Sequence, residues 1–265
     1  MNCIQQTFAN TRRNGRGALI IYLTAGDPSL EETVELVITI AEAGADIVEL
    51  GIPYSDPLAD GPTIQAASQR ALTAGATIQG VFDCAAQIRQ RSPIPLVIMT
   101  CYNPILQFGP EAFAAEASKV GIAGILASDL PPSEAEQWCI IAAEHELATV
   151  FLVAPTTPLQ RVERAVECTT GFVYAVARPG VTGVRDELPE DLKDSVARIR
   201  QVTDLPIAVG FGISTPQQVA AVCEIADGAI VGSAVVDIIA EASDHEARRQ
   251  QVSQFVSDLA AATCQ

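Results

Sequence analysis

The sequence predicts an α/β fold, a (β/α)8 TIM barrel with extra helices that spans residues 1–265 as a single domain. Eight apolar segments of strand length recur along the chain, and stretches of helix length separate them. Most of these segments are apolar without alternation, which is typical of strands buried on both faces of a parallel sheet. A doubly wound open sheet built from the same units is the alternative fold.

The expected strands follow one another at intervals that suit one strand and one crossover helix. In chain order they are Ala18–Gly26, Asp46–Pro53, Pro95–Asn103, Gly124–Leu130, Ala148–Pro155, Phe172–Arg178, Pro206–Gly212 and Gly228–Ala234. The interval after the second strand is the longest and has room for two helices, Pro62–Thr73 and Ile78–Gln90. We expect the final stretch, Val235–Ala262, to form one or two helices that close the ring.

Two of the expected helices begin with recognisable signals. Ser29 with Glu32 predicts a capping box, and Thr215 stands before Pro216 at a first-turn position. In a barrel of this kind, functional residues lie at the carboxyl ends of the strands and in the loops that follow them.

The charge balance argues against nucleic acids and anionic membranes as partners. The chain carries 32 acidic and 16 basic residues, a net charge of −16 at pH 7 that repels phosphate groups. No apolar run approaches the ~18 residues of a membrane-spanning helix. The segment Arg12–Leu23 faintly resembles an export signal, but its apolar run is short and no cleavage site is clear.

The cysteines, lysines and histidines of the chain limit the reactions that it can catalyse. Seven scattered cysteines without a Cys-x-x-Cys motif indicate a reduced, cytoplasmic protein. The two lysines, Lys119 and Lys193, and the two histidines, His145 and His245, fall in expected helical regions. We therefore expect no Schiff-base lysine, no metal site and no histidine-dependent phosphosugar isomerase.

Two carboxylates are the candidate catalytic groups. Glu49 lies inside an expected buried strand, where a charge is costly unless it is paired or used. It is either a structural carboxylate bonded to amides or an arginine, or a general acid–base with a pKa tuned by an apolar pocket. Asp60 follows in a Pro-rich loop, and it either caps the helix that starts at Pro62 or returns over the barrel mouth toward Glu49.

Glycines after the last two strands predict a phosphate site. Gly210-Phe211-Gly212 and Gly232-Ser233 allow close backbone approach, and amides at a following helix start bind anions without any lysine. Barrels often bind phosphate at these two loops. The polar loop Arg178–Pro189 after the sixth strand is either a lid or an ordinary long connection.

The segment Glu49–Pro62, with the sequence Glu-Leu-Gly-Ile-Pro-Tyr-Ser-Asp-Pro-Leu-Ala-Asp-Gly-Pro, resembles the signature of the tryptophan synthase alpha chain family. Shorter matching segments occur in the family's order over nearly the whole chain: Tyr22–Pro28, Met99–Pro104, Asp129–Pro131, Gly180–Gly183 and Val209–Ile213. The resemblance implies a (β/α)8 fold and cleavage of indole-3-glycerol phosphate to indole and glyceraldehyde 3-phosphate, a step of L-tryptophan biosynthesis. It also implies no cofactor in this chain and a beta-chain partner with pyridoxal phosphate in an alpha-beta-beta-alpha tetramer.

The resemblance also implies roles for individual residues. Glu49 would be the acid–base catalyst, and Asp60 would bind the indole N–H. The residues matching the substrate pocket are Tyr22, Thr100, Tyr102, Leu126, Ala127, Tyr174, Thr182 and Phe211. Those matching the phosphate site are Gly183, Gly212, Gly232 and Ser233. Those matching the partner surface are Pro53, Asp56, Asn103, Pro104, Asp129 and Pro131.

Three positions depart from the family's pattern. Ala177 stands where serine is common, Pro179 follows Arg178, and Tyr22 is often phenylalanine. The first two bear on closure of the sixth loop, and Tyr22 bears on the polarity of the pocket. A free-standing lyase, a binding subunit without chemistry of its own and an isomerase of a ribosyl-anthranilate compound are the alternative functions.

Overall fold

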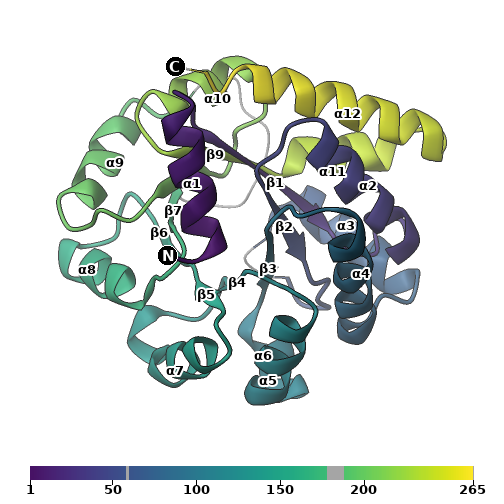
Figure 1. Cartoon of the computed structure of the whole chain (residues 1–265), viewed down its shortest axis with the longest axis horizontal. Helices are drawn as coiled ribbons and strands as arrows, with labels where there is room; N and C mark the ends of the chain where they lie inside the picture. Colours follow the sequence, from purple (N-terminus) through teal and green to yellow (C-terminus); the bar gives the residue numbers. More distant parts are fainter. Residues whose placement is uncertain (58–59, 178–187, 265) are drawn as a thin grey trace.

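The strands form one parallel sheet that closes on itself. The computed structural model describes residues 1–57, 60–177 and 188–264, and in it the strand order is β5-β4-β3-β2-β1-β9-β8-β7-β6. The two strands at the ends of this order are separated in the chain by Val150 alone, so the sheet closes as a barrel with helices around it (Figure 1). The predicted (β/α)8 barrel is therefore confirmed, and the open doubly wound sheet is wrong.

Every expected strand is present, and most end earlier than expected. The strands are β1 Ala18–Thr24, β2 Ile47–Gly51, β3 Leu96–Thr100, β4 Gly124–Ala127, β5 Ala148–Thr149, β6 Phe151–Val153, β7 Val173–Val176, β8 Ile207–Gly210 and β9 Gly228–Val231. The fifth expected strand is split into β5, which pairs with β4, and β6, which pairs with β7. The apolar runs extend past the last paired residues into the loops, which is why the sequence overstated the strand lengths.

The helices surround the barrel and close its amino end. They are α1 Cys3–Arg13, α2 Leu30–Glu42, α3 Pro62–Thr73, α4 Ile78–Arg91, α5 Tyr102–Phe108, α6 Pro110–Lys119, α7 Glu136–Glu144, α8 Leu159–Cys168, α9 Leu192–Arg200, α10 Pro216–Cys223, α11 Ser233–Glu241 and α12 His245–Ala261, with a 3-10 turn η1 at Pro132–Glu134. The helices α3 and α4 occupy the ranges expected of them, with α4 one residue longer. Among the described residues, no helix combines the length and apolar character needed to cross a membrane.

Alternate strand residues form two separate apolar layers. Side chains such as Leu19, Ile21 and Leu50 belong to the outer layer, which the strands share with the surrounding helices. Their neighbours along the chain, such as Ile20 and Ile47, point into the barrel and form the inner layer. This period of two decides which side chains reach the barrel interior, where a functional group has to stand.

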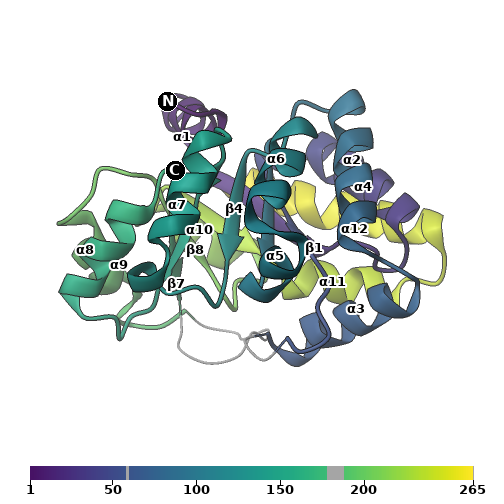
Figure 2. The ribbon, with the colours of Figure 1, turned by 90° about the horizontal axis from the view of Figure 1, so that it is seen from below.

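The N-terminal helix α1, which the sequence did not predict, covers the amino end of the barrel. Ile4 and Phe8 of this helix are buried in the inner layer, where the Phe8 and Phe172 ring centroids lie 5.6 Å apart. Figure 2 shows α1 at one end of the barrel and the start of α3 at the other. The apolar run Ala18–Leu23 lies within buried β1.

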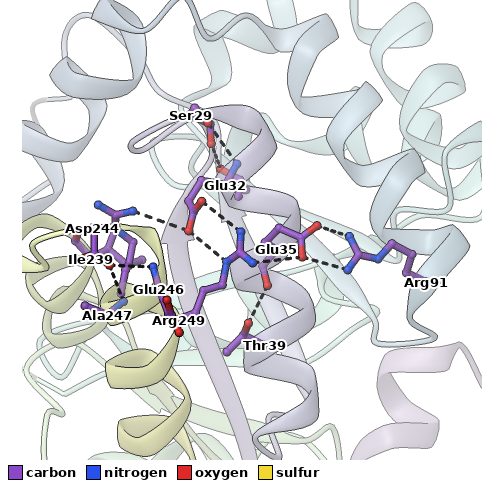
Figure 3. Close-up of polar contacts among 12 residues, drawn as sticks. Ser29, Glu32, Glu35, Thr39, Arg91, Ile239, Asp244, Glu246, Ala247 and Arg249 are labelled. Atoms are coloured by element: carbon purple, nitrogen blue, oxygen red, sulfur yellow. Dashed lines mark hydrogen bonds and ion pairs between the residues drawn. The ribbon is translucent and has the colours of Figure 1, made fainter.

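Two charged residues of α2 join this helix to its neighbours. Ser29 accepts a hydrogen bond from the Glu32 backbone at the start of α2, but the Glu32 side chain pairs with Arg248 and Arg249 of α12 instead of completing a capping box (Figure 3). Only Thr215 of the two predicted starts forms the full box, with Gln218. Glu35 pairs with Arg249 and with Arg91 of α4 in the same way (Figure 3).

Candidate active site

The carboxyl ends of the strands enclose a cavity that opens to solvent. Its lining residues come from β1, β2, β3, β7 and β9, from the starts of α3 and α11, and from the loops after β2, β8 and β9. They are Tyr22, Glu49, Asp60, Ile64, Met99, Tyr174, Phe211, Gly212, Ile213, Ile230, Gly232, Ser233 and Ala234.

Glu49 is a fully buried carboxyl group in the wall of this cavity. It stands in β2 directly beside Tyr22 of β1 and Val97 of β3. Among the described residues, neither of its carboxyl oxygens has a hydrogen-bond partner. The structural alternative, a carboxylate bonded to amides or to an arginine, is therefore wrong for these residues. Burial without compensating bonds disfavours the charged form and raises the pKa of Glu49 to about 8.

Asp60 enters the same cavity from the loop that follows β2. The helix after it starts at Pro62 with Gly61 as its N-cap, so Asp60 is not the capping residue. Gln65 Nε2 donates to the Asp60 backbone carbonyl at 2.8 Å, which ties the loop to the first turn of α3. Partial burial raises the pKa of Asp60 to about 6.

An ion pair between the first two βα units holds α3 in place. Arg70 of α3 binds Asp27, which follows β1, through two hydrogen bonds of 2.8 and 2.7 Å. Asp27 is buried, and this two-point geometry fixes the orientation of the arginine. Because Asp60 stands two residues before α3, the pair indirectly fixes where the loop carrying Asp60 ends.

Aromatic rings form the walls between the two acids and the last strands. The rings of Tyr174 and Phe211 meet edge to face, with centroids 5.6 Å apart and planes at 67°. Phe211 has a φ of 74°, in the left-handed region that non-glycine residues rarely adopt. Burial, and then the nearby Glu49 and Tyr22, raise the pKa of Tyr174 well above its ordinary value.

Another part of the cavity lining is rich in backbone amides. Gly212 has a φ of 89°, Gly232 is the N-cap of α11, and Ser233 is the first residue of that helix. Within the described ranges no side chain caps this helix start, so the N–H groups of Ser233 and Ala234 are left for an anion. The helix dipole adds a partial positive charge at the same place.

Several residues that the family resemblance assigns to the pocket are not among the lining residues of this cavity. Thr100 and Ala127 belong to the outward-facing set of their strands, Leu126 is buried in the inner layer, and the Tyr102 ring contacts Trp138 at 6.2 Å. Two further assigned residues, Thr182 and Gly183, lie outside the described residues, as do Arg178 and Pro179. The described Ala177 is buried at the end of β7.

The remaining cavity residues were not singled out from the sequence. The sequence could have predicted Met99 and Ile230 as cavity residues. Each follows an inward-facing residue of its own strand, Val97 or Gly228, by two positions and so faces the same side. Ile64, Ile213 and Ala234 follow strand ends, and only the folded loops bring them to the cavity. All five side chains are apolar, and they extend the nonpolar wall of the cavity.

The residues assigned to a partner surface follow β2, β3 and β4. Asp56, Asn103, Asp129 and Pro131 are exposed, whereas Pro53 and Pro104 are buried. Asn103 Nδ2 donates to the Tyr54 hydroxyl at 3.1 Å, and the Tyr102 backbone N–H donates to Asp129 at 2.6 Å. These bonds link three consecutive loops on one face of the molecule.

The two lysines and two histidines of the chain lie in the outer helices or at their ends. Lys119 ends α6 and Lys193 is in α9, while His145 is the C-cap of α7 and His245 begins α12. None of them lines the cavity. Within the part of the chain that the structure describes, no group of His, Cys, Asp and Glu is arranged to hold a metal ion.

Comparison with known proteins assigns the chain to a family. The family model of the tryptophan synthase alpha chain matches residues 8–264. The tryptophan synthase alpha chain of Geobacter sulfurreducens is 47% identical over 259 residues, covering 98% of each chain, and that of Chloroflexus aggregans is 47% identical over 264 residues, covering 99% of this chain and 98% of that one.

Solved structures agree with this assignment. A structure of Mycobacterium tuberculosis tryptophan synthase superposes with a TM-score of 0.91 and 37% identity, covering 99% of this chain and 98% of that chain. The tryptophan synthase alpha subunit of Legionella pneumophila gives a TM-score of 0.90 and 36% identity with the same coverage. The chain belongs to the tryptophan synthase alpha chain family, which serves tryptophan biosynthesis.

Proposed function

We propose that this chain is a carbon–carbon lyase that cleaves indole-3-glycerol phosphate to indole and glyceraldehyde 3-phosphate, as the alpha subunit of tryptophan synthase. The observation that carries the proposal is the meeting of Glu49 and Asp60 in one cavity whose far edge is lined by Gly212, Gly232 and Ser233. An acid pair, an apolar wall and an anion site suit the chemistry of the three parts of this substrate.

The different pKa values of the two acids assign them different roles. At neutral pH Glu49, with a pKa of about 8, carries a proton, whereas Asp60, with a pKa of about 6, is mostly ionised. Two acids whose surroundings separate their pKa values can serve as proton donor and as fixed negative charge. Glu49 is therefore the acid–base group of the proposed reaction, and Asp60 is the carboxylate that accepts the indole N–H.

The proposed cleavage needs no group beyond these. Glu49 donates its proton to C3 of the indole ring, and Asp60 stabilises the positive charge that develops on the ring nitrogen. The Glu49 carboxylate then takes the proton of the adjacent glycerol hydroxyl. That oxygen becomes the aldehyde carbonyl, and the electron pair of the breaking carbon–carbon bond returns to the ring. Glu49 ends the cycle protonated, so protons and electrons balance.

The rest of the cavity suits the remaining parts of the substrate. Tyr22, Tyr174 and Phe211 offer ring faces and edges to a flat aromatic bicycle, and the amides of Gly212, Gly232 and Ser233 offer donors to its phosphate. Thr182 and Gly183 remain assigned to the substrate and phosphate through the resemblance alone. In this proposal Thr100, Tyr102, Leu126 and Ala127 support the lining residues from behind.

We propose a beta chain as the partner, in an alpha-beta-beta-alpha tetramer of the cytoplasm. The linked loops that carry Asp56, Asn103, Asp129 and Pro131 offer exposed polar groups at the cavity end of the barrel, where a partner could receive the released indole. Pyridoxal phosphate would belong to that partner, and this chain needs no cofactor for the cleavage.

A direct assay tests the proposal. Purified chain should release indole from indole-3-glycerol phosphate slowly alone and faster when a purified beta chain is added. Equal rates with and without the beta chain would indicate a free-standing lyase, and no indole under either condition would leave a binding subunit.

The variant Glu49→Gln should lose turnover while it still binds a phosphate-bearing product such as glyceraldehyde 3-phosphate. This is expected because the amide keeps the shape of the site but cannot exchange the proton. Indole release by colour reaction and ligand binding by calorimetry measure the two effects. Substantial turnover in this variant would make Glu49 a structural residue and overturn the mechanism.

A further inference from the structure

The loop after β8 brings backbone amides to the cavity. Phe211, Gly212 and Ile213 line the cavity, and the first two have φ values of 74° and 89°. Among the described residues, the backbone N–H groups of Gly212 and Ile213 have no hydrogen-bond partner, although Ile213 is buried. Buried N–H groups are rarely left without a partner, and consecutive ones in such a turn can bind an anion. These two amides therefore indicate a site for an anion.

The conformation of this loop needs support from its surroundings, because a left-handed φ is unfavourable for Phe211. The sheet holds the first end of the loop, where the Ala177 backbone N–H donates to the Gly210 carbonyl oxygen at 2.8 Å. At the other end, where α10 starts, two backbone N–H groups bind the side chain of Gln218. The loop Phe211–Thr215 is thus fixed at both ends, and the cavity residues lie between them.

Three donors meet on the side-chain oxygen of Gln218. Its Oε1 accepts from the Ser214 backbone N–H at 2.8 Å, from the Thr215 backbone N–H at 3.2 Å and from the Ser214 hydroxyl at 3.3 Å. Backbone N–H groups can only donate, so the atom that they meet is the oxygen of the side-chain amide. Gln218 and Ser214 are both buried, with 5% and 8% exposed. Water therefore competes little for these bonds.

A capping box alone does not explain this arrangement. Thr215 and Gln218 do form such a box: the Thr215 hydroxyl accepts from the Gln218 backbone N–H at 3.2 Å, and the Gln218 side chain accepts from the Thr215 backbone N–H. A box links the N-cap to the third residue of a helix. The two bonds to Ser214 are additional, and they extend the contacts of Gln218 into the loop, next to Ile213.

We propose that Gln218 is a positioning residue of the phosphate site: its side-chain oxygen holds the end of the loop, so that the amides of Gly212 and Ile213 stay where they can bind phosphate. Gln218 is not one of the residues that line the cavity, so it acts through the loop. The proposal rests on the proposed function for the identity of this phosphate as part of indole-3-glycerol phosphate. Phosphate binding itself can be tested without that identity.

Gln218→Met tests this role in the full-length chain, because methionine has a similar length but no oxygen to accept the three bonds. Titration calorimetry with inorganic phosphate measures the phosphate site. Titration with indole, which has no phosphate group, measures the rest of the cavity. We expect the dissociation constant for phosphate to rise about tenfold, because binding must then order the loop. The dissociation constant for indole should stay within about twofold of the wild-type value.

Two variants at the start of α10 are the controls. Gln217→Met makes the same exchange at an exposed neighbour and should bind phosphate like the wild type. Thr215→Val removes the hydroxyl that caps the helix, so it should lower the midpoint of thermal unfolding. Phosphate binding should change less than about twofold in Thr215→Val, because the acceptor of the loop bonds remains. Equal weakening of phosphate binding in Gln218→Met and Thr215→Val would mean that only the stability of the helix matters, and would overturn the proposal.

Ser214→Ala removes one of the three donors and keeps the acceptor. It should weaken phosphate binding by less than Gln218→Met does, and it should have no further effect in a Gln218→Met background. Equal effects in both backgrounds, unchanged phosphate binding in Gln218→Met, or a wild-type chain that binds no phosphate would each overturn the proposal. If Gln218→Met does not fold, Ser214→Ala decides alone: weaker phosphate binding supports the proposal, and unchanged binding overturns it.

Steady-state kinetics connect the loop to the reaction. A loss of binding that is equal in the ground state and the transition state raises KM and leaves kcat unchanged. Gln218→Met should therefore raise KM for indole-3-glycerol phosphate about tenfold with little change in kcat. A fall in kcat with an unchanged KM would overturn the positioning role. A wild-type chain that binds phosphate but has no lyase activity would defeat the proposed function and leave calorimetry to decide the role of Gln218.

Discussion

Glu49 is a carboxylic acid that its surroundings keep protonated at neutral pH. Its fully buried oxygens have no partner among the described residues, and their removal from water raises its pKa. Asp60 is less buried, and its pKa is raised less. Different degrees of burial thus distinguish two side chains of the same chemical type.

These two pKa values predict a bell-shaped pH profile for the lyase. In the proposed mechanism Asp60 has to be ionised, so kcat/KM should rise with pH through about 6. Glu49 has to be protonated at the start, so kcat/KM should fall above about 8. Initial rates of indole release between pH 5 and 9 measure both limbs. A rate that still climbs at pH 9 would show that Glu49 acts first as a base.

At the scale of helices and strands, two groups of ion pairs differ in how much they stabilise the fold. Arg70 joins α3 to the loop after β1 through the buried Asp27, whereas Glu35 joins α2 to α4 and α12 at a partly exposed surface (Figure 3). Removing one partner of a buried pair leaves an uncompensated charge, while exposed pairs contribute little.

Arg70→Ala should therefore lower the free energy of unfolding by about 2 kcal/mol, discounted from the range for fully buried pairs because the arginine is partly exposed. It should also weaken the site, since α3 starts beside Asp60. Denaturant unfolding and indole release measure the two effects.

Glu35→Gln is the matched control for this change. It should lower the stability by less than about 1 kcal/mol and leave the activity unchanged, with an effect that shrinks further at high salt. A larger loss in Glu35→Gln than in Arg70→Ala would contradict this ranking of the two groups.

At the scale of the whole molecule, the buried Glu49 makes the fold less stable at higher pH. The pKa of Glu49 rises from an ordinary 4.5 to about 8 on folding. Between these values the unfolded chain releases the proton and the folded chain keeps it, so rising pH favours unfolding. The full contribution of Glu49 to the free energy of unfolding is present below pH 4.5, and it is lost as the pH rises to about 8.

Glu49→Gln should therefore stabilise the protein by a few kcal/mol at pH 8 and by little at pH 4.5, since glutamine does not ionise. Thermal unfolding across this pH range measures the difference between variant and wild type. Glu163→Gln on the exposed face of α8 is a control and should show no such pH dependence. A stability difference that does not change with pH would mean that Glu49 is not protonated in the folded state.

The sequence by itself determined the fold class, the eight strands and the two acids. Apolar runs buried on both faces follow directly from residue type, and a lone Glu49 within such a run stands out because a buried charge is costly. The split at Val150 and the early ends of the strands were not predictable, because an apolar run does not show where pairing between neighbours stops.

Only the tertiary structure decided which residues share the cavity. Within β3, Met99 faces inward and Thr100 outward, a choice set by the phase of the strand against its neighbours. It also decided that Asp60 lines the cavity and does not cap α3, and that Tyr22 places its hydroxyl over Gly51. The physical reason is that residue type sets the preference of a side chain for burial and for secondary structure. Contacts between segments far apart in the chain determine which other side chains lie beside it.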